Sequence, residues 1–317
     1  MIYVLYVMIA AAVVLLSVKA SDYVDLLDKK TSLSGAFIGG IMLSAVTSLP
    51  ELFTSISATV LIHEPGLCLG NILGSDLFNL AALSLFVLLF YRSFATAELS
   101  SSHRMVVLLV FGCYLAVTLN WTGILDINVF RISLTSICVV VLYALSVRYL
   151  ASDNGPEAQP QEEQGAADGL SVKRIAVRFV LVSIGIIATS ICITYVTDLI
   201  AARLNLGQGL AGALFLGVAT SLPEVSSTIA LFRIGNFDIA FGNIIGSNIF
   251  NFIIMAVVDM LYRGSVYDFS DPRTVTLLLC GMASLPFAWA LMKYRNKLTQ
   301  LVCPIVILGC YGLFLLA

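Results

Sequence analysis

Two glutamates are the residues of this sequence best placed to do chemistry. Glu51 and Glu224 each end the same string, Thr-Ser-Leu-Pro-Glu, at residues 47–51 and 220–224, inside long apolar runs. A carboxylate in the interior of a membrane span costs about 2.5 kcal/mol or more unless it meets a cavity, a partner or a cation. Because no Lys or Arg lies near either glutamate in its apolar run, the sequence predicts that both carboxylates face a cation from solution.

The residues beside each glutamate supply neutral oxygen ligands. Pro50 and Pro223 each remove a helical N–H and release a backbone carbonyl about one turn earlier. Neutral oxygens combined with carboxylates suit a hard cation such as calcium or sodium. The hydroxyl groups available in the two strings are those of Thr47, Ser48, Thr220 and Ser221.

A second string follows each glutamate string. Residues 70–79 read Gly-Asn-Ile-Leu-Gly-Ser-Asp-Leu-Phe-Asn, and residues 242–251 read Gly-Asn-Ile-Ile-Gly-Ser-Asn-Ile-Phe-Asn. The glycines four residues apart favour close packing of helices. The serine and the last asparagine of each string share one helix face: Ser75 with Asn79, and Ser247 with Asn251. Both strings occur twice at nearly the same offset, 220 − 47 = 173 and 242 − 70 = 172, so the chain contains an internal duplication.

Composition places these strings in a membrane. The chain of 317 residues is 59% hydrophobic and 11% charged, far below the roughly 25% charged residues of a typical soluble protein. A span needs roughly 20 mainly apolar residues. Ten such stretches are predicted, at about 1–20, 33–62, 66–91, 104–123, 128–150, 174–202, 208–232, 238–262, 273–293 and 298–317.

The spans divide into two equal groups. A polar, acidic stretch at 151–173 predicts a flexible linker between a first repeat at 1–150 and a second at 174–317. Each repeat has five spans. Because five is an odd number, the second repeat enters the membrane from the side opposite to the first. The predicted fold is an all-α polytopic membrane protein of ten transmembrane helices in two inverted five-helix repeats. In transporters of this architecture the substrate site lies near the bilayer midplane, where the repeats meet.

The basic residues predict the orientation. With the N-terminus outside, 13 of the 17 Lys and Arg residues fall on the inner side, and four, Arg131, Arg203, Arg263 and Arg273, fall on the outer side. Positive residues favour the cytoplasmic side. We therefore expect both termini outside and the linker in the cytoplasm, in a bacterial or archaeal cell membrane.

The paired strings in a ten-span inverted repeat resemble the cation/calcium antiporter superfamily, most of all its prokaryotic sodium/calcium exchanger branch. The resemblance implies electrogenic exchange of calcium for sodium by alternating access. It implies that Glu51 and Glu224 are central calcium ligands shared with sodium, and that Asn79 and Asn251 fill the remaining central positions. The flanking sodium sites would be lined by carbonyls near Ser44 and Gly217 and by the side chains of Thr47, Ser48, Ser75, Thr220, Ser221 and Ser247.

The chain departs from that family at functionally important positions. Asn79 and Asn251 stand where calcium-transporting members tend to carry at least one aspartate, so the site is less negative. Asp76 stands where the family usually has asparagine, as at Asn248. Asp76 either points into the site as a further cation ligand and restores the missing charge, or faces a helix partner in protonated form. Residues 45–46 and 218–219 also lack the glycine usual before threonine.

Ionisable residues outside the strings have simpler interpretations. Asp259 lies four residues before Arg263 near the outer end of the eighth span, which predicts an ordinary ion pair. His63 and Glu64 fall in the short outer loop between the second and third spans. They are expected to form a solvated turn, with a cation entry site as the alternative.

The leading hypothesis is a secondary antiporter that binds calcium and sodium, in which the first and sixth spans move across a core of the second, third, seventh and eighth. Its rival is a proton-coupled calcium/cation antiporter, although the Gly-Asn-Ala-x-Glu pattern of the cation/proton branch is missing. A channel is disfavoured because inverted repeats suit alternating access. An enzyme is not predicted, because there is no HExxH string and no GxGD-type aspartyl signature. No cofactor, nucleic acid or protein partner is predicted, only the transported ions and the lipid bilayer.

Overall fold

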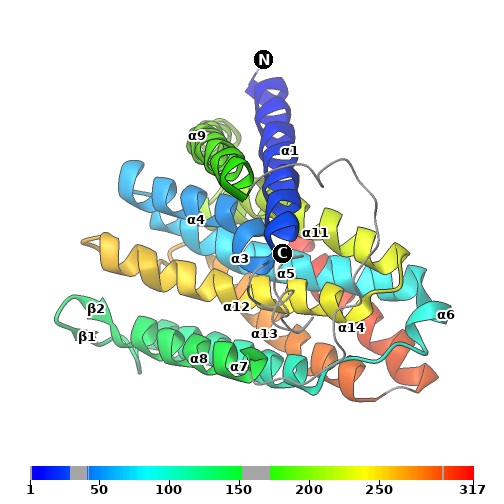
Figure 1. The fold of residues 1–317 in the computed structure, drawn as a ribbon. Helices are drawn as coiled ribbons and strands as arrows, with labels where there is room; N and C mark the ends of the chain where they lie inside the picture. The colour runs from blue at the N-terminus through cyan, green and yellow to red at the C-terminus, as the bar shows by residue number, and fades with distance from the viewer. Residues whose placement is uncertain (1, 29–40, 42, 152–171, 295) are drawn as a thin grey trace.

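The computed structural model describes residues 2–28, 41, 43–151, 172–294 and 296–317, which form a helical bundle (Figure 1). Two short segments, η2 and η3, are π-helices. In chain order the elements are α1 (Ile2–Asp28), α3 (Ser44–Thr47), α4 (Leu49–Ile56), η2 (Ser57–Leu61), α5 (Pro65–Leu89), α6 (Tyr91–Phe94), α7 (Ser101–Trp121), β1 (Asn128–Val129), β2 (Ile132–Ser133), α8 (Leu134–Ala151), α9 (Val172–Leu204), α10 (Gln208–Ala211), η3 (Gly212–Gly217), α11 (Val218–Arg233), α12 (Phe237–Leu261), α13 (Pro272–Lys293) and α14 (Lys297–Leu316).

The helices are suited to a membrane. Among the described residues, nine helices are long and apolar enough to cross it, and Leu49–Leu61 is a shorter apolar helix that falls within the second predicted span. Helices satisfy their own backbone hydrogen bonds where no water is present. The prediction of an all-α, multi-pass membrane protein is confirmed, and these helices are consistent with ten spans. Residues 33–40 and 42 of the second span, and 152–171 of the linker, lie outside the described residues, so the domain boundaries stay predictions.

The fifth span begins later than the sequence predicted. Residues 128–133 form a two-stranded antiparallel hairpin, and α8 starts at Leu134 instead of 128. Phe130 has a φ of 60° at the turn, a conformation that the apolar composition did not reveal. The strand pairing satisfies backbone groups before the helix begins, so the apolar residues of 128–133 belong to a hairpin outside the helix.

The predicted pair between Asp259 and Arg263 is wrong. No salt bridge joins them in the described part of the chain. Asp259 Oδ2 instead accepts hydrogen bonds from the backbone N–H of Ser133 and from Ser136 Oγ, both at 2.8 Å. A buried carboxylate with two donors is satisfied without a cation. Asp259 therefore fixes the hairpin and the start of α8 to α12.

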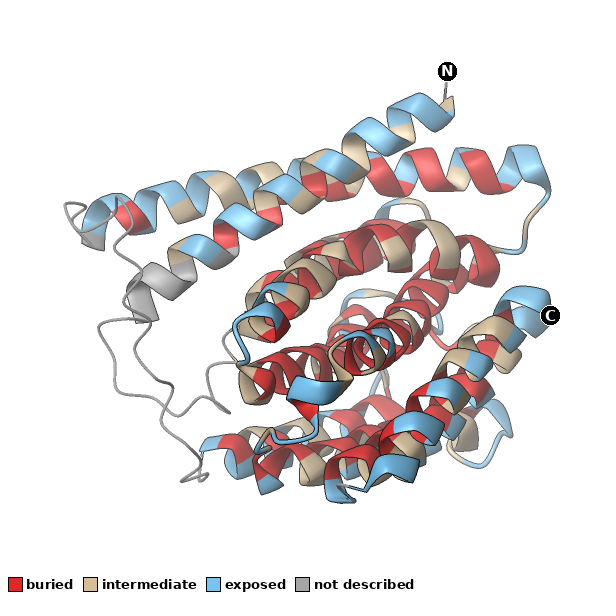
Figure 2. Ribbon diagram, turned by 90° about the vertical axis from the view of Figure 1, so that its right-hand side faces the viewer, coloured by how far each residue is buried: buried red, intermediate tan, exposed pale blue. Residues whose placement is uncertain are grey.

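Helices α1 and α9 form a pair at the edge of the bundle. They pack against each other, and in Figure 1 α1 runs across the direction of α7, α8 and α12. Figure 2 shows both as long helices with many exposed residues, while the buried residues concentrate in the middle of the bundle. One contact ties the pair to the interior: Tyr6 Oη donates to the carbonyl of Phe215 in η3 at 2.6 Å.

Helices α5 and α12, which carry the Gly-Asn strings, form the centre of the bundle. In the most apolar stretch of each helix, 78% of the residues of α5 and 72% of those of α12 are buried, compared with 17% in α1. Each packs against the glutamate-bearing helix of its own repeat and of the other: α5 against α4 and α11, and α12 against α11 and α4. The helices of the four predicted core spans therefore pack against one another.

Glycines let α5 approach the second repeat backbone to backbone. A Cβ on Gly70 would collide with the carbonyl of Gly209, and one on Gly74 would lie 2.5 Å from Ala213 Cα. From the other side, a Cβ on Gly217 would lie 2.9 Å from the backbone nitrogen of Ser75. The expected close approach of the glycine spacing at 70 and 74 is thus present, and it brings the string on α5 beside η3.

Helical regularity breaks next to both glutamate strings. In the first, α3 ends at Thr47 and α4 begins at Leu49, with Ser48 between them at φ −86° and ψ 11°. In the second, α11 continues through Pro223, but η3 precedes it directly. Prolines and π-helices leave backbone carbonyls without their usual helical donor, and such irregularities are frequent at functional sites.

Candidate cation site

The two glutamates meet between α4 and α11. Glu51 is 1% exposed and Glu224 is 0% exposed. Ser221 Oγ donates to Glu51 Oε1 at 3.2 Å, and Ser48 Oγ donates to Glu224 Oε1 at 2.9 Å. Each carboxylate therefore takes its hydroxyl donor from the opposite repeat. This reciprocal pairing places both carboxyl groups at one contact between the repeats.

One oxygen of each carboxylate has no hydrogen-bond partner among the described residues. Glu51 Oε2 and Glu224 Oε2 are buried and accept no hydrogen bond from any described residue. Neither glutamate forms a salt bridge within the described chain. A buried charge without partners is unfavourable by several kcal/mol, of the order of the cost of desolvating one ion. The two free oxygens therefore suit a cation bound between them.

The two threonines of the strings are fully buried and donate to backbone carbonyls of the preceding turn. Thr47 Oγ1 donates to the carbonyls of Leu43 and Ser44, and Thr220 Oγ1 donates to the carbonyl of Leu216. A hydroxyl that donates its proton to the preceding turn keeps lone pairs on its oxygen. Both threonine oxygens are therefore available as neutral ligands, as the hydroxyls of Ser48 and Ser221 are through their bonds to the glutamates.

The serines of α5 and α12 are also buried here but differ in their contacts. Ser75 Oγ donates to the carbonyl of Gly217 at 3.2 Å, which puts it beside the end of η3. Ser247 Oγ is buried and has no hydrogen-bond partner among the described residues. A hydroxyl and a carbonyl side by side are two oxygen ligands of the kind that sodium and calcium prefer.

Asn79 and Asn251 present unpaired oxygens. Asn79 Nδ2 donates to Asn248 Oδ1 at 3.0 Å, and Asn251 Nδ2 donates to Asp76 Oδ1 at 2.9 Å. The Oδ1 atoms of both Asn79 and Asn251 are buried without a donor in the described chain. Asp76 is itself fully buried, and one carboxylate oxygen contacts Asn251 while Oδ2 has no hydrogen bond. Asp76 thus adjoins the predicted ligands and contacts one of them directly.

Sequence reasoning missed two asparagines that hold the glutamate helices. Asn71 Nδ2 donates to Thr54 Oγ1 and Ser55 Oγ, at 3.1 and 3.0 Å, one turn after Glu51. Asn243 Nδ2 donates in the same way to Ser227 Oγ and Thr228 Oγ1, at 2.9 and 3.1 Å. Their recurrence directly after the first glycine of each Gly-Asn string was the available signal. Each locks its string to the glutamate helix of the same repeat.

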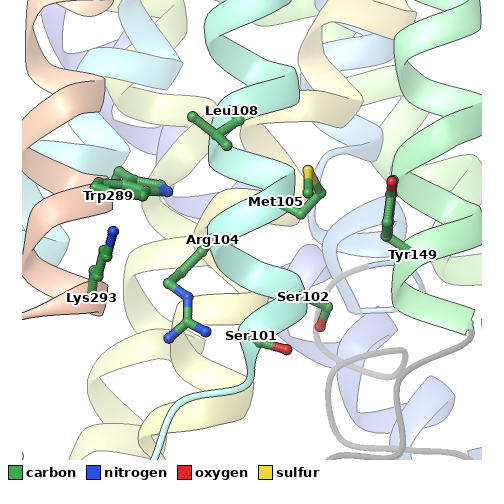
Figure 3. Close-up of a pocket in the computed structure, with 8 residues that line it drawn as sticks. All are labelled: Ser101, Ser102, Arg104, Met105, Leu108, Tyr149, Trp289 and Lys293. Atoms are coloured by element: carbon green, nitrogen blue, oxygen red, sulfur yellow. The ribbon is translucent and has the colours of Figure 1, made fainter.

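A separate pocket has the wrong chemistry for a cation. It has a volume of about 600 Å³ and lies between α7, α8 and α13 (Figure 3). Arg104 and Lys293 line it, and Lys293 Nζ lies 4.5 Å from the centre of the Trp289 ring. None of its lining residues is a carboxylate. The buried polar residues between the repeats therefore remain the better candidate for the cation site: the glutamates pair with the crossed serines there, and Asp76, Asn79, Asn248 and Asn251 form a second hydrogen-bonded group between α5 and α12.

Comparison with known proteins supports the same fold. The family model of the sodium/calcium exchanger protein matches residues 1–151 and 175–317. Inner membrane protein YrbG of Escherichia coli (strain K12) is 28% identical over 267 residues, covering 79% of this chain and 76% of that protein. Sodium/calcium exchanger MaX1 of Methanosarcina acetivorans is 31% identical over 98 residues, 29% of this chain and 28% of that protein.

Two solved structures share the architecture. The H+/Ca2+ exchanger CAX superposes with a TM-score of 0.74 at 16% identity, covering 99% of this chain and 87% of that one. The sodium-calcium exchanger NCX_Mj superposes with a TM-score of 0.67 at 19% identity, covering 100% and 99%. At such identities these matches establish the fold. The family model, however, covers both repeats nearly completely, and the chain belongs to the sodium/calcium exchanger family of membrane transporters.

Proposed function

We propose that this protein exchanges calcium for sodium across the cell membrane by alternating access, with the ions bound between the repeats. The observation that carries this proposal is the reciprocal pairing of Ser48 with Glu224 and Ser221 with Glu51, which leaves one oxygen of each carboxylate free. Membership of the exchanger family supports it. No cofactor takes part; calcium and sodium are the substrates.

The two glutamates would bind calcium at the centre, with the amide oxygens of Asn79 and Asn251 completing the set. Sodium ions would use the same glutamates together with the hydroxyls of Thr47, Ser48, Ser75, Thr220, Ser221 and Ser247. Hard cations of this kind take oxygen ligands at sites where the charge of the ligands sets the affinity. Two carboxylates cannot remain bare in the membrane interior, so the empty carrier would not cross. That restriction couples the two ions.

Movement of α1 and α9 would open the site. Every predicted ligand is at most 1% exposed, so an ion reaches it only when the surrounding helices separate. The α1–α9 pair lies at the edge of the bundle with many exposed residues, and it contacts the interior near the site through Tyr6 and Phe215. Rigid-body movement of one group of helices against another is the usual route to alternating access. The basic residues support termini on the outside.

A proton-coupled exchanger is the second candidate. The two central asparagines make the site less negative than one with aspartates, which leaves room for coupling to a different cation. The fold likeness to an H+/Ca2+ exchanger is at least as close as that to a sodium-calcium exchanger, so fold alone does not separate the candidates.

Calcium uptake into proteoliposomes separates them. Vesicles are loaded with sodium, with potassium at matched pH, or with a proton gradient imposed. Uptake that requires internal sodium supports sodium/calcium exchange; uptake driven only by protons supports the second candidate. Glu51→Gln and Glu224→Gln proteins are the controls, and undiminished uptake in both would contradict the site. A wild-type protein that takes up calcium under none of these conditions would overturn calcium transport altogether.

A further inference from the structure

We propose that Asp76 and Asn248 are positioning residues that turn the amide oxygens of Asn251 and Asn79 toward the cation. This inference rests on the proposed cation site. Asp76 and Asn248 occupy equivalent places in the two Gly-Asn strings, directly after Ser75 and Ser247. Each contacts the central asparagine of the opposite repeat, so the pair repeats the crossed arrangement of the serines and glutamates.

Asp76 fixes Asn251. Asn251 Nδ2 lies 2.9 Å from Asp76 Oδ1, and both residues are at most 1% exposed. A carboxylate accepts hydrogen bonds, and an asparagine amide has one accepting end and one donating end. With Asp76 ionised, the donating end of Asn251 faces it, because the reverse orientation would bring two acceptors together. The oxygen of Asn251 is left pointing elsewhere, and it has no donor in the described chain.

Asn248 fixes the orientation of the Asn79 amide, and its own orientation is fixed by the backbone of Asp76. Asn248 Nδ2 donates to the backbone carbonyl of Asp76 at 3.1 Å, and a carbonyl only accepts. The oxygen of Asn248 therefore faces the other way, where Asn79 Nδ2 donates to it at 3.0 Å. The oxygen of Asn79 is again the end left without a partner. Both orientation chains thus begin at Asp76, one at its side chain and one at its backbone.

The arrangement explains why the two equivalent positions carry different residues. At 248 the side chain must both donate and accept, which asparagine does and aspartate does not. At 76 the side chain must only accept, which a carboxylate does without an alternative orientation. An amide turned the wrong way would present hydrogen atoms to a cation, so a wrong orientation removes a ligand and adds repulsion. Asp76 and Asn248 thereby affect cation affinity through the amide groups of Asn251 and Asn79.

Double-mutant cycles test the proposal, with calcium-dependent uptake and cation-dependent thermal stabilisation as readouts. We expect Asn248→Ala to raise the half-saturating cation concentration by about 3- to 10-fold, the size of one lost orienting hydrogen bond. This variant changes no charge. In an Asn79→Ala background the same substitution should have no further effect, because nothing remains to be oriented.

Asp76→Asn gives the second cycle, in which Asn251→Ala is the background. If Asp76 acts by orienting Asn251, its effect on affinity disappears in that background; if it acts only through its charge, the loss is equal in both. Asp259→Asn is the matched control, since it also neutralises a buried carboxylate at α12 but lies about 12 Å along the helix from Asn251 at 1.5 Å per residue. It should leave cation affinity unchanged.

The outcomes separate this inference from the proposed site. Glu51-dependent cation binding with strictly additive cycles would overturn the positioning role and leave the site intact. If no cation stabilises the protein through Glu51, the site and the positioning role are both overturned.

Discussion

The two repeats carry nearly the same strings but build different local structures around them. The first glutamate helix breaks at Ser48 and is followed by the π-helix η2, whereas the second runs unbroken through Pro223 to Arg233. π-helical residues precede both strings, Ile41 and Leu43 in the first repeat and η3 in the second. Despite this, the contacts at the carboxylates are equivalent: each glutamate accepts from the serine of the other repeat. Symmetry is therefore kept where the ions would bind and relaxed where the helices must adapt to different neighbours.

The largest expected effect comes from the glutamates themselves. If the repeats are equivalent at the site, Glu51→Gln and Glu224→Gln should each lower apparent calcium affinity by about 100-fold or more, because calcium affinity follows the number of charged ligands. Uptake of labelled calcium measures both. Retained transport in one variant alone would show that the symmetry of the contacts is not a symmetry of function.

The next effect concerns packing between repeats. Gly74→Ala should destabilise the protein by about 1–3 kcal/mol, since the new methyl group would overlap Ala213. Gly309→Ala on α14, where nothing lies within 4 Å, is the control and should be neutral or stabilising by up to about 1 kcal/mol. Thermal unfolding in detergent compares them. Gly246→Ala, the equivalent change on α12, extends the comparison; an unaffected melting temperature there would confine the close packing to one repeat.

A smaller effect is expected for the crossed serines. Ser48→Ala and Ser221→Ala each remove one hydrogen bond to a charged group, which corresponds to about a 10-fold change in cation affinity. The bond of Ser48 is shorter, 2.9 against 3.2 Å, so we expect its loss to have the larger effect. Half-saturating sodium and calcium concentrations provide the measurement. The reverse order would mean that hydrogen-bond length does not rank the two halves.

The smallest effect lies at the loops that precede α5 and α12. Asn236 caps α12 by accepting from the N–H of Ile239, whereas Glu64, at the equivalent place before α5, makes no side-chain cap. Burial, with the nearby carboxylates of Asp198 and Asp268, raises the pKa of Glu64. A carboxylate with a raised pKa in the folded state favours folding at low pH, and this contribution is lost as the pH rises through the raised value.

Glu64→Gln should therefore flatten the fall in melting temperature as the pH rises above about 4, the ordinary range of a glutamate. The comparison with wild type is made at each pH in the same detergent. An unchanged slope would remove Glu64 from the pH response. Asn236→Ala, in contrast, should lose about 1 kcal/mol of stability at all these pH values, as the loss of a helix cap does.

Much of the fold followed from the sequence because membrane spans are encoded locally. Apolar length predicted most spans closely, including α12, expected at 238–262 and found at Phe237–Leu261. The hairpin at 128–133 was missed because Val129, Phe130 and Ile132 extend the apolar run that forms α8. Its position depends on Asp259, which is far away in sequence and which the i, i+4 spacing had assigned to Arg263.

For the site, the sequence predicted that the two glutamate strings would meet, but not which atoms of them make contact. Repetition drew attention to Glu51 and Glu224, since a costly carboxylate kept twice needs a cause. Their crossed serine donors depend on how α4 packs against α11, which no local pattern states. Asp76 had two open interpretations for the same reason. Its contact with Asn251 crosses between the repeats and is decided by the close approach of the central helices.

The crossed pairing at the carboxylates also constrains how the protein is made. When the first half has entered the membrane, Glu51 still lacks Ser221, the donor that its carboxylate uses in the finished bundle. Insertion of α11 supplies that donor and at the same time gives Glu224 its own partner, Ser48. Neither half alone holds a finished site. The crossed pairing is therefore completed only when α11 packs against α4, and until then the nascent chain carries a membrane-embedded acid without its partner.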